Sequence, residues 1–344
     1  MTFRASSDIG STDLRTPKKK APSIVPAQNV KLAAIGMLGL IVITAGCAPK
    51  GDRLSPRRRL ALDEESSSSL PDSFAIAGVR RDARGRYVVW SNSGSYMLLY
   101  DGGRRTALAR EGYIDGVVGA DFNRNGRVEA IAVTANGNRR VEFSDSGDVV
   151  GVQRLAVPAA PTQAALVDSE WWIGGVAKRG AFVVYRVSRA GHSAEVFRVE
   201  PGRGGRDTFP VAAHLSTAGA GALVALIRKP FTIWRVNPKG TVTVESEPLA
   251  SAAVRKVLTG GGLDWWVSLR AIPLDAAVLQ TLADLRSEHR VLVVVDNGGA
   301  IANATDLAAP IGFVDSDPVR HAVCAVRTLN VRELVCYRWQ WNLR

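Results

Sequence analysis

From Ser73 to the C-terminus, short apolar segments alternate with polar turns that end in glycine. The turns are rich in Asn, Asp, Ser and Gly, which tolerate the positive φ angles of tight hairpins. An aromatic or β-branched pattern precedes each turn, as is typical of strands. The pattern therefore predicts a succession of antiparallel strand pairs with almost no helix. The glycines that close the turns are Gly103, Gly147, Gly191, Gly240 and Gly299.

These glycines recur at spacings of 44, 44, 49 and 59 residues. A period of about 40 to 50 residues with several short strands per unit is typical of a β-propeller. The strand before each hairpin strand is almost continuously apolar, which indicates burial on both faces inside a blade. Five units are expected, at 73–111, 114–156, 162–201, 208–248 and 253–305.

Three tryptophans, Trp90, Trp172 and Trp266, fall on these apolar second strands. Aromatic side chains bury a large apolar area, so packing between neighbouring blades accounts for them without a ligand. A surface on which a ligand stacks is the alternative interpretation.

The long spacing before the last glycine is assigned to a helix inserted between two strands of the fifth unit, at 273–288. Pro273 stands at its start, where proline is favoured in helices. Apolar side chains then follow at helical spacing. They are Leu274, Val278, Leu282 and Leu285.

Residues 311–341 supply three further strands, so a sixth blade would lack its fourth strand. A propeller closes when one terminus completes the blade formed by the other, because this removes an exposed edge. The segment 57–62 is one way to complete the blade, and a short blade is the alternative. The sequence thus predicts an all-β fold over 73–344, a β-propeller of about six blades with one short helical insertion.

Ahead of this domain, residues 32–45 form an apolar run without a charge. A membrane-spanning helix needs about 20 apolar residues, so this run is short for a permanent anchor and suits the core of a signal peptide. Lys31 and the cluster at 18–20 supply the positive flank. We therefore interpret 1–46 as a signal peptide, whose unusual length would be explained by a start codon nearer Val30.

Residues 43–47, Ile-Thr-Ala-Gly-Cys, resemble the bacterial lipobox, in which the cysteine is acylated and becomes the new N-terminus. The resemblance implies lipidation at Cys47, attachment to the lipid bilayer and a place in the cell envelope. Ala48 resembles the outer-membrane sorting pattern of a Gram-negative cell. The alternative is a membrane-anchored protein in which Cys47 is incidental. Residues 47–72 are charged and serine-rich, which predicts a flexible tether without folded structure.

Cys324 and Cys336 flank a candidate hairpin that turns near Asn330. Residues directly opposed on antiparallel strands have Cβ atoms about 4.5–5.5 Å apart, close to the separation that a disulfide needs. Export permits such a bond. We predict a disulfide between Cys324 and Cys336, with two buried free thiols as the alternative.

The strongest candidate for a metal site is the stretch 120–133, in which alternate side chains of a loop are expected to converge around the turn at Gly126. Hard oxygen ligands in this spacing suit Ca²⁺. The candidate ligands are the side chains of Asp121, Asn123, Asn125 and Glu129 and the carbonyl of Arg127. A metal-free turn, satisfied by its own Asn and Asp side chains, is the alternative.

This stretch resembles the FG-GAP or VCBS repeat, a propeller blade whose inter-strand loop reads Asp-x-Asn-x-Asp-Gly-x-x-Asp. The resemblance is confined to one unit and implies a propeller used for adhesion or binding, with Ca²⁺ stiffening some loops. Asn125 replaces the usual acid here, and Arg124 and Arg127 add positive charge, which weakens the expected Ca²⁺ affinity.

The net charge of +12 is spread along the chain. Nucleic-acid binding usually concentrates basic residues on one face, whereas a dispersed basic surface fits anionic lipid or cell-wall polymer. No catalytic motif is found: the four histidines are scattered, no Gly-x-Ser-x-Gly elbow occurs, and the glycine-rich stretch 202–206 lacks the Lys-Ser/Thr of a phosphate loop.

Two functions follow from these patterns. The first is a membrane-tethered exported lipoprotein whose propeller is a binding or scaffolding module for proteins or cell-envelope polymers. The second is an exported enzyme, a glycan hydrolase or lyase with carboxylates in the central funnel. A cluster of acids at the mouth of the channel favours the enzyme, whereas an apolar or basic face favours binding.

Overall fold

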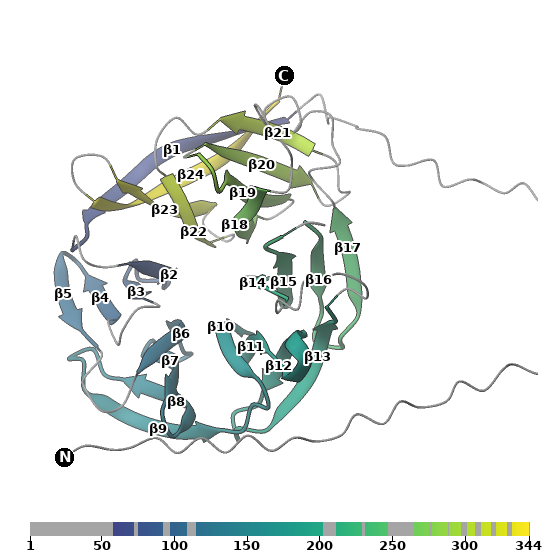
Figure 1. Cartoon of the computed structure of the whole chain (residues 1–344). Helices are drawn as coiled ribbons and strands as arrows, with labels where there is room; N and C mark the ends of the chain where they lie inside the picture. The colour runs from purple at the N-terminus through teal and green to yellow at the C-terminus, as the bar shows by residue number, and fades with distance from the viewer. Residues whose placement is uncertain are drawn as a thin grey trace, which may run out of the picture. The chain divides into compact units, whose positions relative to one another are not determined.

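The computed structural model describes residues 58–71, 75–91, 97–108, 115–201, 211–228, 231–246, 265–274, 277–287, 289–296, 301–306, 311–317, 321–328 and 332–343. All of them belong to the unit of the chain that begins at residue 49. Six four-stranded antiparallel sheets stand around a common centre in this unit (Figure 1). The fold is therefore a six-bladed β-propeller, as the sequence predicts.

Each blade places its first strand nearest the centre of the ring, and the later strands follow outwards (Figure 1). Blade 1 comprises β2 (Ile76–Arg81), β3 (Tyr87–Ser91), β4 (Met97–Asp101) and β5 (Arg104–Ala107). Blade 2 comprises β6 (Gly116–Phe122), β7 (Val128–Thr134), β8 (Gly137–Phe143) and β9 (Val149–Leu155). Blade 3 comprises β10 (Ala160–Val167), β11 (Glu170–Val176), β12 (Phe182–Val187) and β13 (Ser193–Val199), with a short 3-10 turn, η1 (Lys178–Gly180), between β11 and β12.

The second half of the ring repeats this order. Blade 4 comprises β14 (Ala213–Ala218), β15 (Gly221–Leu226), β16 (Ile233–Val236) and β17 (Val242–Ser246). Blade 5 comprises β18 (Trp266–Pro273), β19 (Ala277–Asp284), β20 (Arg290–Asp296) and β21 (Ile301–Asp306). Blade 6 comprises β22 (Ile311–Asp317), β23 (Ala322–Thr328) and β24 (Arg332–Leu343), and its outermost strand is β1 (Arg58–Ser69).

One five-residue turn recurs within the blades and accounts for Gly147, Gly191 and Gly240 of the glycine repeat, whereas Gly103 lies in the shorter β4–β5 turn and Gly299 lies outside the described residues. The first residue of the five-residue turn is Asp, Asn or Ser, whose side-chain oxygen accepts backbone N–H groups of the turn. Its fourth residue is a glycine with φ between 75° and 88°, which other residues rarely adopt. The turns are 82–86, 123–127, 144–148, 188–192 and 237–241.

The apolar core is divided into six clusters, each packed between two neighbouring blades. Trp90 packs between blades 1 and 2, Trp172 between blades 3 and 4, and Trp266 between blades 4 and 5. Each is at most 7% exposed. The expected role of these tryptophans in packing between blades is therefore confirmed.

The predicted helix at 273–288 is wrong, because residues 277–284 form the second strand of blade 5. Every residue of β19 is buried, so the strand has no polar face and no alternation. Apolar residues four apart, Leu274, Val278 and Leu282, then satisfy the helical spacing by coincidence. The same shift places Trp266 on a first strand rather than a second one, and the extra length of this repeat lies between β17 and β18, at 247–265.

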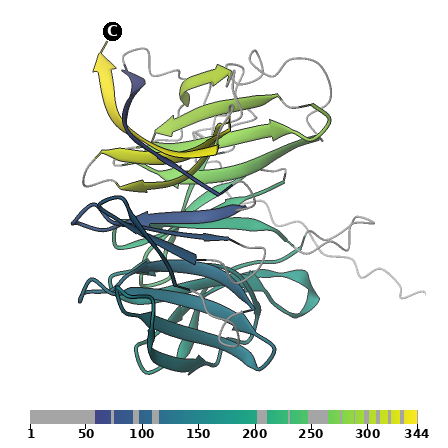
Figure 2. The same cartoon turned by 90° about the vertical axis from the view of Figure 1, so that its left-hand side faces the viewer.

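The expectation that 47–72 is entirely a tether is also wrong, since β1 pairs antiparallel with β24 from Arg58↔Leu343 to Ser69↔Glu333. The N-terminal strand thus completes the last blade, and it runs beside β24 in both views (Figures 1 and 2). Its residues 63–69 are exposed, as an outermost strand allows. Its acids are matched by partners on β23 and β24: Arg327 with Glu64, Arg338 with Glu65 and Gln340 with Asp63.

The disulfide between Cys324 and Cys336 is present. The two cysteines are direct partners in the pairing of β23 with β24, at the second and third strands of blade 6. The register also pairs Thr328 with Arg332, so the hairpin turns within 329–331 as predicted, although these three residues lie outside the described part of the chain.

Candidate functional site

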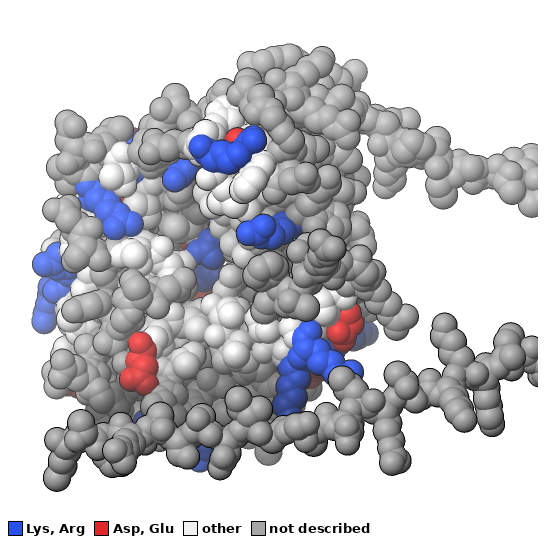
Figure 3. Space-filling view, viewed as in Figure 1, with Lys and Arg blue, Asp and Glu red and all other residues white. Residues whose placement is uncertain are grey.

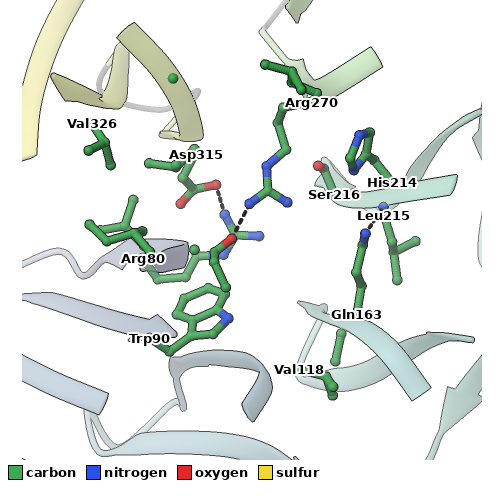
Figure 4. A pocket seen from close by; sticks show the side chains of 18 of the residues that line it. Arg80, Trp90, Val118, Gln163, His214, Leu215, Ser216, Arg270, Asp315 and Val326 are labelled. Carbon is green, nitrogen blue, oxygen red and sulfur yellow. Dashed lines mark hydrogen bonds and ion pairs between the residues drawn. The ribbon is translucent and has the colours of Figure 1, made fainter. Parts of the chain in front are cut away.

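A cavity of about 440 Å³ lies at the centre of the ring and is lined by residues from all six first strands (Figure 4). Five of these strands carry a β-bulge. A bulge bends its strand and re-aims the side chain of the extra residue. The extra residues are Ala77, Val118, Thr162, Leu269 and Val314, and all five line the cavity. The fold therefore repeats one local distortion around the site.

Arg80 on β2 crosses the channel and joins several blades. Its guanidinium forms an ion pair with Asp315 of blade 6 (Figure 4). It forms a second ion pair, at 3.3 Å, with Asp121 of blade 2. It also lies 3.5 Å from the hydroxyl of Thr217 in blade 4. Burial lowers the pKa of Arg80 and raises the pKa of Asp121, and the attraction between the two charges works against both shifts. Arg80 is thus neutralised by acids of the protein.

Arg270 on β18 enters the same channel from blade 5, and its guanidinium lies near that of Arg80 (Figure 4). It donates a hydrogen bond to the carbonyl of Ala77 in blade 1. No described carboxylate forms an ion pair with it. Burial, and secondarily the positive charge of Arg80, lowers the pKa of Arg270 to about 10. Arg270 is therefore a partly buried cation whose countercharge is absent from the described part of the protein.

Polar side chains join the first strands of blades 3 to 6. The amide of Gln163 bonds to the backbone of β14, at Ala213 O and Leu215 N. Ser216 donates to Ala271 O at 3.0 Å, and Ser316 donates to Pro273 O at 2.6 Å. These bonds fix the walls of the cavity.

His214 lines the cavity between blades 4 and 5. Its Nε2 lies 2.8 Å from the carbonyl of Ser268, and because a carbonyl only accepts, Nε2 carries the proton. Burial, followed by the positive charge of Arg270, lowers the pKa of His214 to about 4, although the bond to Ser268 opposes the shift. The ring is neutral at pH 7, so Nδ1 is an acceptor, and it is buried without a hydrogen-bond partner among the described residues.

The lining is basic. Arg80, Arg270, Arg290 and Arg332 contribute to it, whereas Asp315 is the one acid among the lining residues. In the view along the ring, Lys and Arg side chains lie around and within the centre of the face (Figure 3). Acidic side chains are few there among the described residues. The arrangement attracts an anion rather than a cation.

The residues predicted to bind Ca²⁺ lie together at the β6–β7 turn, but their side chains do not form an oxygen cage. Asp121 is directed to Arg80, and Asn123 caps its own turn at the backbone N–H groups of Asn125 and Arg127. The amide nitrogen of Asn123, not its oxygen, faces Glu129, at 3.1 Å. The residues in this arrangement do not fit the ion.

No group of three or more His, Cys, Asp or Glu side chains that could hold a metal occurs in the described ranges. Calcium binding at the loop stays a prediction. Calcium titration of the folded protein, followed by the thermal midpoint, tests it.

Other predicted features lie elsewhere. Cys47, the apolar run 32–45 and the glycine-rich stretch 202–206 are outside the described residues. Within the described ranges, no helix is long and apolar enough to cross a membrane. His192 is exposed in a turn, and only His214 among the histidines lines the cavity.

The residues at the centre of the site were missed in the sequence. Arg270 is the single arginine of β18, and Arg80 is followed by Arg81 at the end of β2, so the sequence does not reveal which arginine enters the channel. The available signal was positional but incomplete: side chains alternate along an innermost strand, so Arg80 lines the channel whereas its neighbour Arg81 lies over the Tyr87 ring.

No protein-family model matches the chain, and no curated protein sequence matches it. Among solved structures, the PQQ-bound form of an aldose sugar dehydrogenase from Streptomyces coelicolor gives a TM-score of 0.54 at 12% identity, over 83% of this chain and 100% of that one. A luciferin-regenerating enzyme gives 0.53 at 7% identity, over 81% and 95%. At these identities the likeness shows the fold alone, a β-propeller.

Proposed function

We propose that this chain is an exported lipoprotein, acylated at Cys47, whose propeller is a binding or scaffolding module at the cell envelope. The resemblance of 43–47 to a lipobox, behind an uncharged apolar run, supports the tether. Its partners are the lipid bilayer, through the acylated cysteine, and a protein or envelope polymer. In a Gram-negative cell the proposed location is the outer membrane, because Ala48 follows the cysteine.

The basic lining of the central cavity is the observation that favours binding over catalysis. Glycoside hydrolases use two carboxylates, commonly about 5–9.5 Å apart, on either side of the bond that is cleaved. Asp315 is the one acid among the lining residues, and it is paired with Arg80. The cavity therefore supports recognition of a ligand better than hydrolysis of a glycan.

The start of β1 at Arg58 shortens the proposed tether. An extended chain spans at most about 3.3–3.6 Å per residue, so an anchor at Cys47 lies within about 40 Å of β1.

Metabolic labelling with radioactive palmitate tests the tether. The Cys47→Ser variant is expected to lose the label and the membrane fraction, while the Ala48→Ser control keeps both. Labelling that persists in Cys47→Ser would overturn the lipid anchor.

Co-purification from detergent-solubilised membranes tests the binding role. A protein or polymer that copurifies in fixed ratio with the wild-type chain supports it. Release of reducing ends from envelope glycan by the purified propeller would instead favour the enzyme.

A further inference from the structure

We propose that the central cavity binds a small hydroxylated molecule through its oxyanion, a carboxylate or a phosphate, held by Arg270 and Arg332. The inference deepens the proposed function and rests on its binding role, not on the lipid anchor. The shared chemistry of the two oxyanions is that both accept several charge-assisted hydrogen bonds from guanidinium groups.

Two partly buried arginines of the channel differ in their partners. Arg80 is paired with two carboxylates, those of Asp121 and Asp315. Arg270 lies beside it in the channel, and among the described residues it donates to the neutral carbonyl of Ala77. A buried charge without a counterion is costly, so a site that keeps one is built to receive an opposite charge. An oxyanion in the cavity supplies that charge.

Arg332 adds a second donor. It lines the same cavity from the beginning of β24, and its Nε is buried with no hydrogen-bond partner among the described residues. Two guanidinium groups from different blades give an oxyanion more donors than one arginine offers, and they distinguish it from a neutral ligand.

The polar side chains of the cavity indicate the rest of the ligand. Besides the arginines, the lining includes the hydroxyl groups of Thr162, Ser216 and Thr328 and the amide of Gln163. A hydroxyl group both donates and accepts, so hydroxyl groups on the ligand suit this polar lining beside the negative charge.

The size and walls of the site set the remaining limits. A volume of about 440 Å³ falls in the range of roughly 300–1,000 Å³ for small-molecule sites. Trp90, Val118 and Val314 give part of the wall an apolar character. A single sugar acid or sugar phosphate, free or at the end of a polymer, has this combination of charge, hydroxyls and carbon skeleton.

Isothermal titration calorimetry with three matched sugars tests the proposal. The probes are glucose, glucuronate and glucose 6-phosphate, which share a ring and differ in charge. At least one of the two anions is expected to bind about tenfold more tightly than glucose or better, because only an anion pairs with Arg270. The stronger of the two distinguishes a carboxylate from a phosphate site, and inorganic phosphate tests the oxyanion alone.

Substitution of the lining arginines tests which side chains bind the anion. Arg270→Met is expected to weaken binding of the preferred anion about tenfold or more, whereas Arg286→Met, an exposed arginine of the same blade, changes it less than about twofold. Arg332→Met and Arg270→Lys serve as second variants should Arg270→Met fail to fold. Thermal unfolding of each variant reports the fold separately.

The proposal is overturned if neither anion binds at concentrations up to about 20 mM, or if glucose binds as tightly as the anions. It is also overturned if folded Arg270→Met and Arg332→Met both retain anion binding. These outcomes leave palmitate labelling at Cys47 and capture of a macromolecular partner unaffected, so failure of the anion site and failure of the tethered binding module are distinguishable.

Discussion

Blades 2 and 6 have the same four-stranded architecture but are assembled differently. Blade 2 is one continuous segment, from Gly116 to Leu155, and its strands are joined by turns that cap themselves. Blade 6 takes three strands from the C-terminal end of the chain and its outermost strand, β1, from the N-terminal end. The comparison teaches that local turn chemistry specifies a blade, whereas closure of the ring depends on pairing between distant parts of the chain.

The two blades are linked through a single side chain. Arg80 of blade 1 pairs with Asp121 in blade 2 and with Asp315 in blade 6. At the channel, the ion pairs of Arg80 link blades 1, 2 and 6. At the outer edge of blade 6, the ring is closed by backbone pairing of β24 with β1. Four changes to the protein measure how much these contacts contribute to its stability, and they follow from the largest expected effect to the smallest.

Removal of β1 is expected to have the largest effect. A chain that begins at Pro71 leaves the edge of β24 unpaired and the ring open, and we expect it to lose most of the roughly 5–15 kcal/mol typical of a folded domain. Thermal unfolding followed by circular dichroism, together with limited proteolysis, measures this. A chain that begins at Pro49 keeps β1 and is the control; equal midpoints for the two chains would refute closure by β1.

The role of β1 also shows where sequence reasoning stopped. The hairpins, the repeat and the cysteine register were predictable because each depends on residues close together in the chain, such as Asn123 and Gly126 within one turn. The first part of β1 was predictable, because the apolar Leu60 and Leu62 pack against the core and the segment 57–62 was offered to complete the last blade. The acidic and serine-rich part at 63–69 carries no apolar signal, since its side chains are exposed and it is held by backbone pairing.

The second strand of blade 5 and the central cavity were not predicted from the sequence, for a related reason. β19 is buried on both faces, so its leucines have no alternation that would separate a strand from a helix. Arg80 and Arg270 gain their meaning from the closed ring, which brings β2 and β18 to one channel. The propeller fold was therefore predictable from the sequence. The arginines at the centre of the cavity could be identified only once the assembled blades placed them in one channel.

Arg80→Met is expected to have the next largest effect. It leaves the Asp121 and Asp315 carboxylates in the channel without their counterion, and breaking a buried pair in this way costs about 3–5 kcal/mol. Urea denaturation measures the loss. Adding Asp121→Asn and Asp315→Asn to Arg80→Met is expected to restore part of the stability, and no recovery would show that packing rather than charge dominates.

Reduction of the disulfide in blade 6 ranks third. The bond closes a short loop, with a sequence separation of 12, so the chain-entropy model gives about 3 kcal/mol at most. We expect the thermal midpoint to fall by roughly 5–10 °C without unfolding at room temperature. Mass spectrometry of a non-reduced digest should recover the Cys324–Cys336 peptide pair, and two free thiols in exported protein would contradict the bond. Cys47→Ser, outside the propeller, is the control and should leave the midpoint unchanged.

The smallest effect is expected at the turn of blade 2. Gly126 has φ of +75°, and an added Cβ would lie 3.3 Å from the Arg86 guanidinium. An L-residue in this conformation costs about 1–2 kcal/mol. Gly102, in a turn of blade 1, has φ of +52° and open space around its Cα, so Gly102→Ala carries the conformational cost without the contact.

Chemical denaturation of the two variants therefore separates backbone strain from crowding of Arg86, which donates to the carbonyl of Gly126 and pairs with Asp82 at 2.7 Å. We expect Gly126→Ala to be the more destabilised of the two, by a few tenths of a kcal/mol or more. Equal losses in the free energy of unfolding for Gly126→Ala and Gly102→Ala would mean that the Arg86 side chain moves aside without cost. A loss at Gly126→Ala that approaches the effect of Arg80→Met would show that the turn, rather than the closure, is the weaker part of the ring.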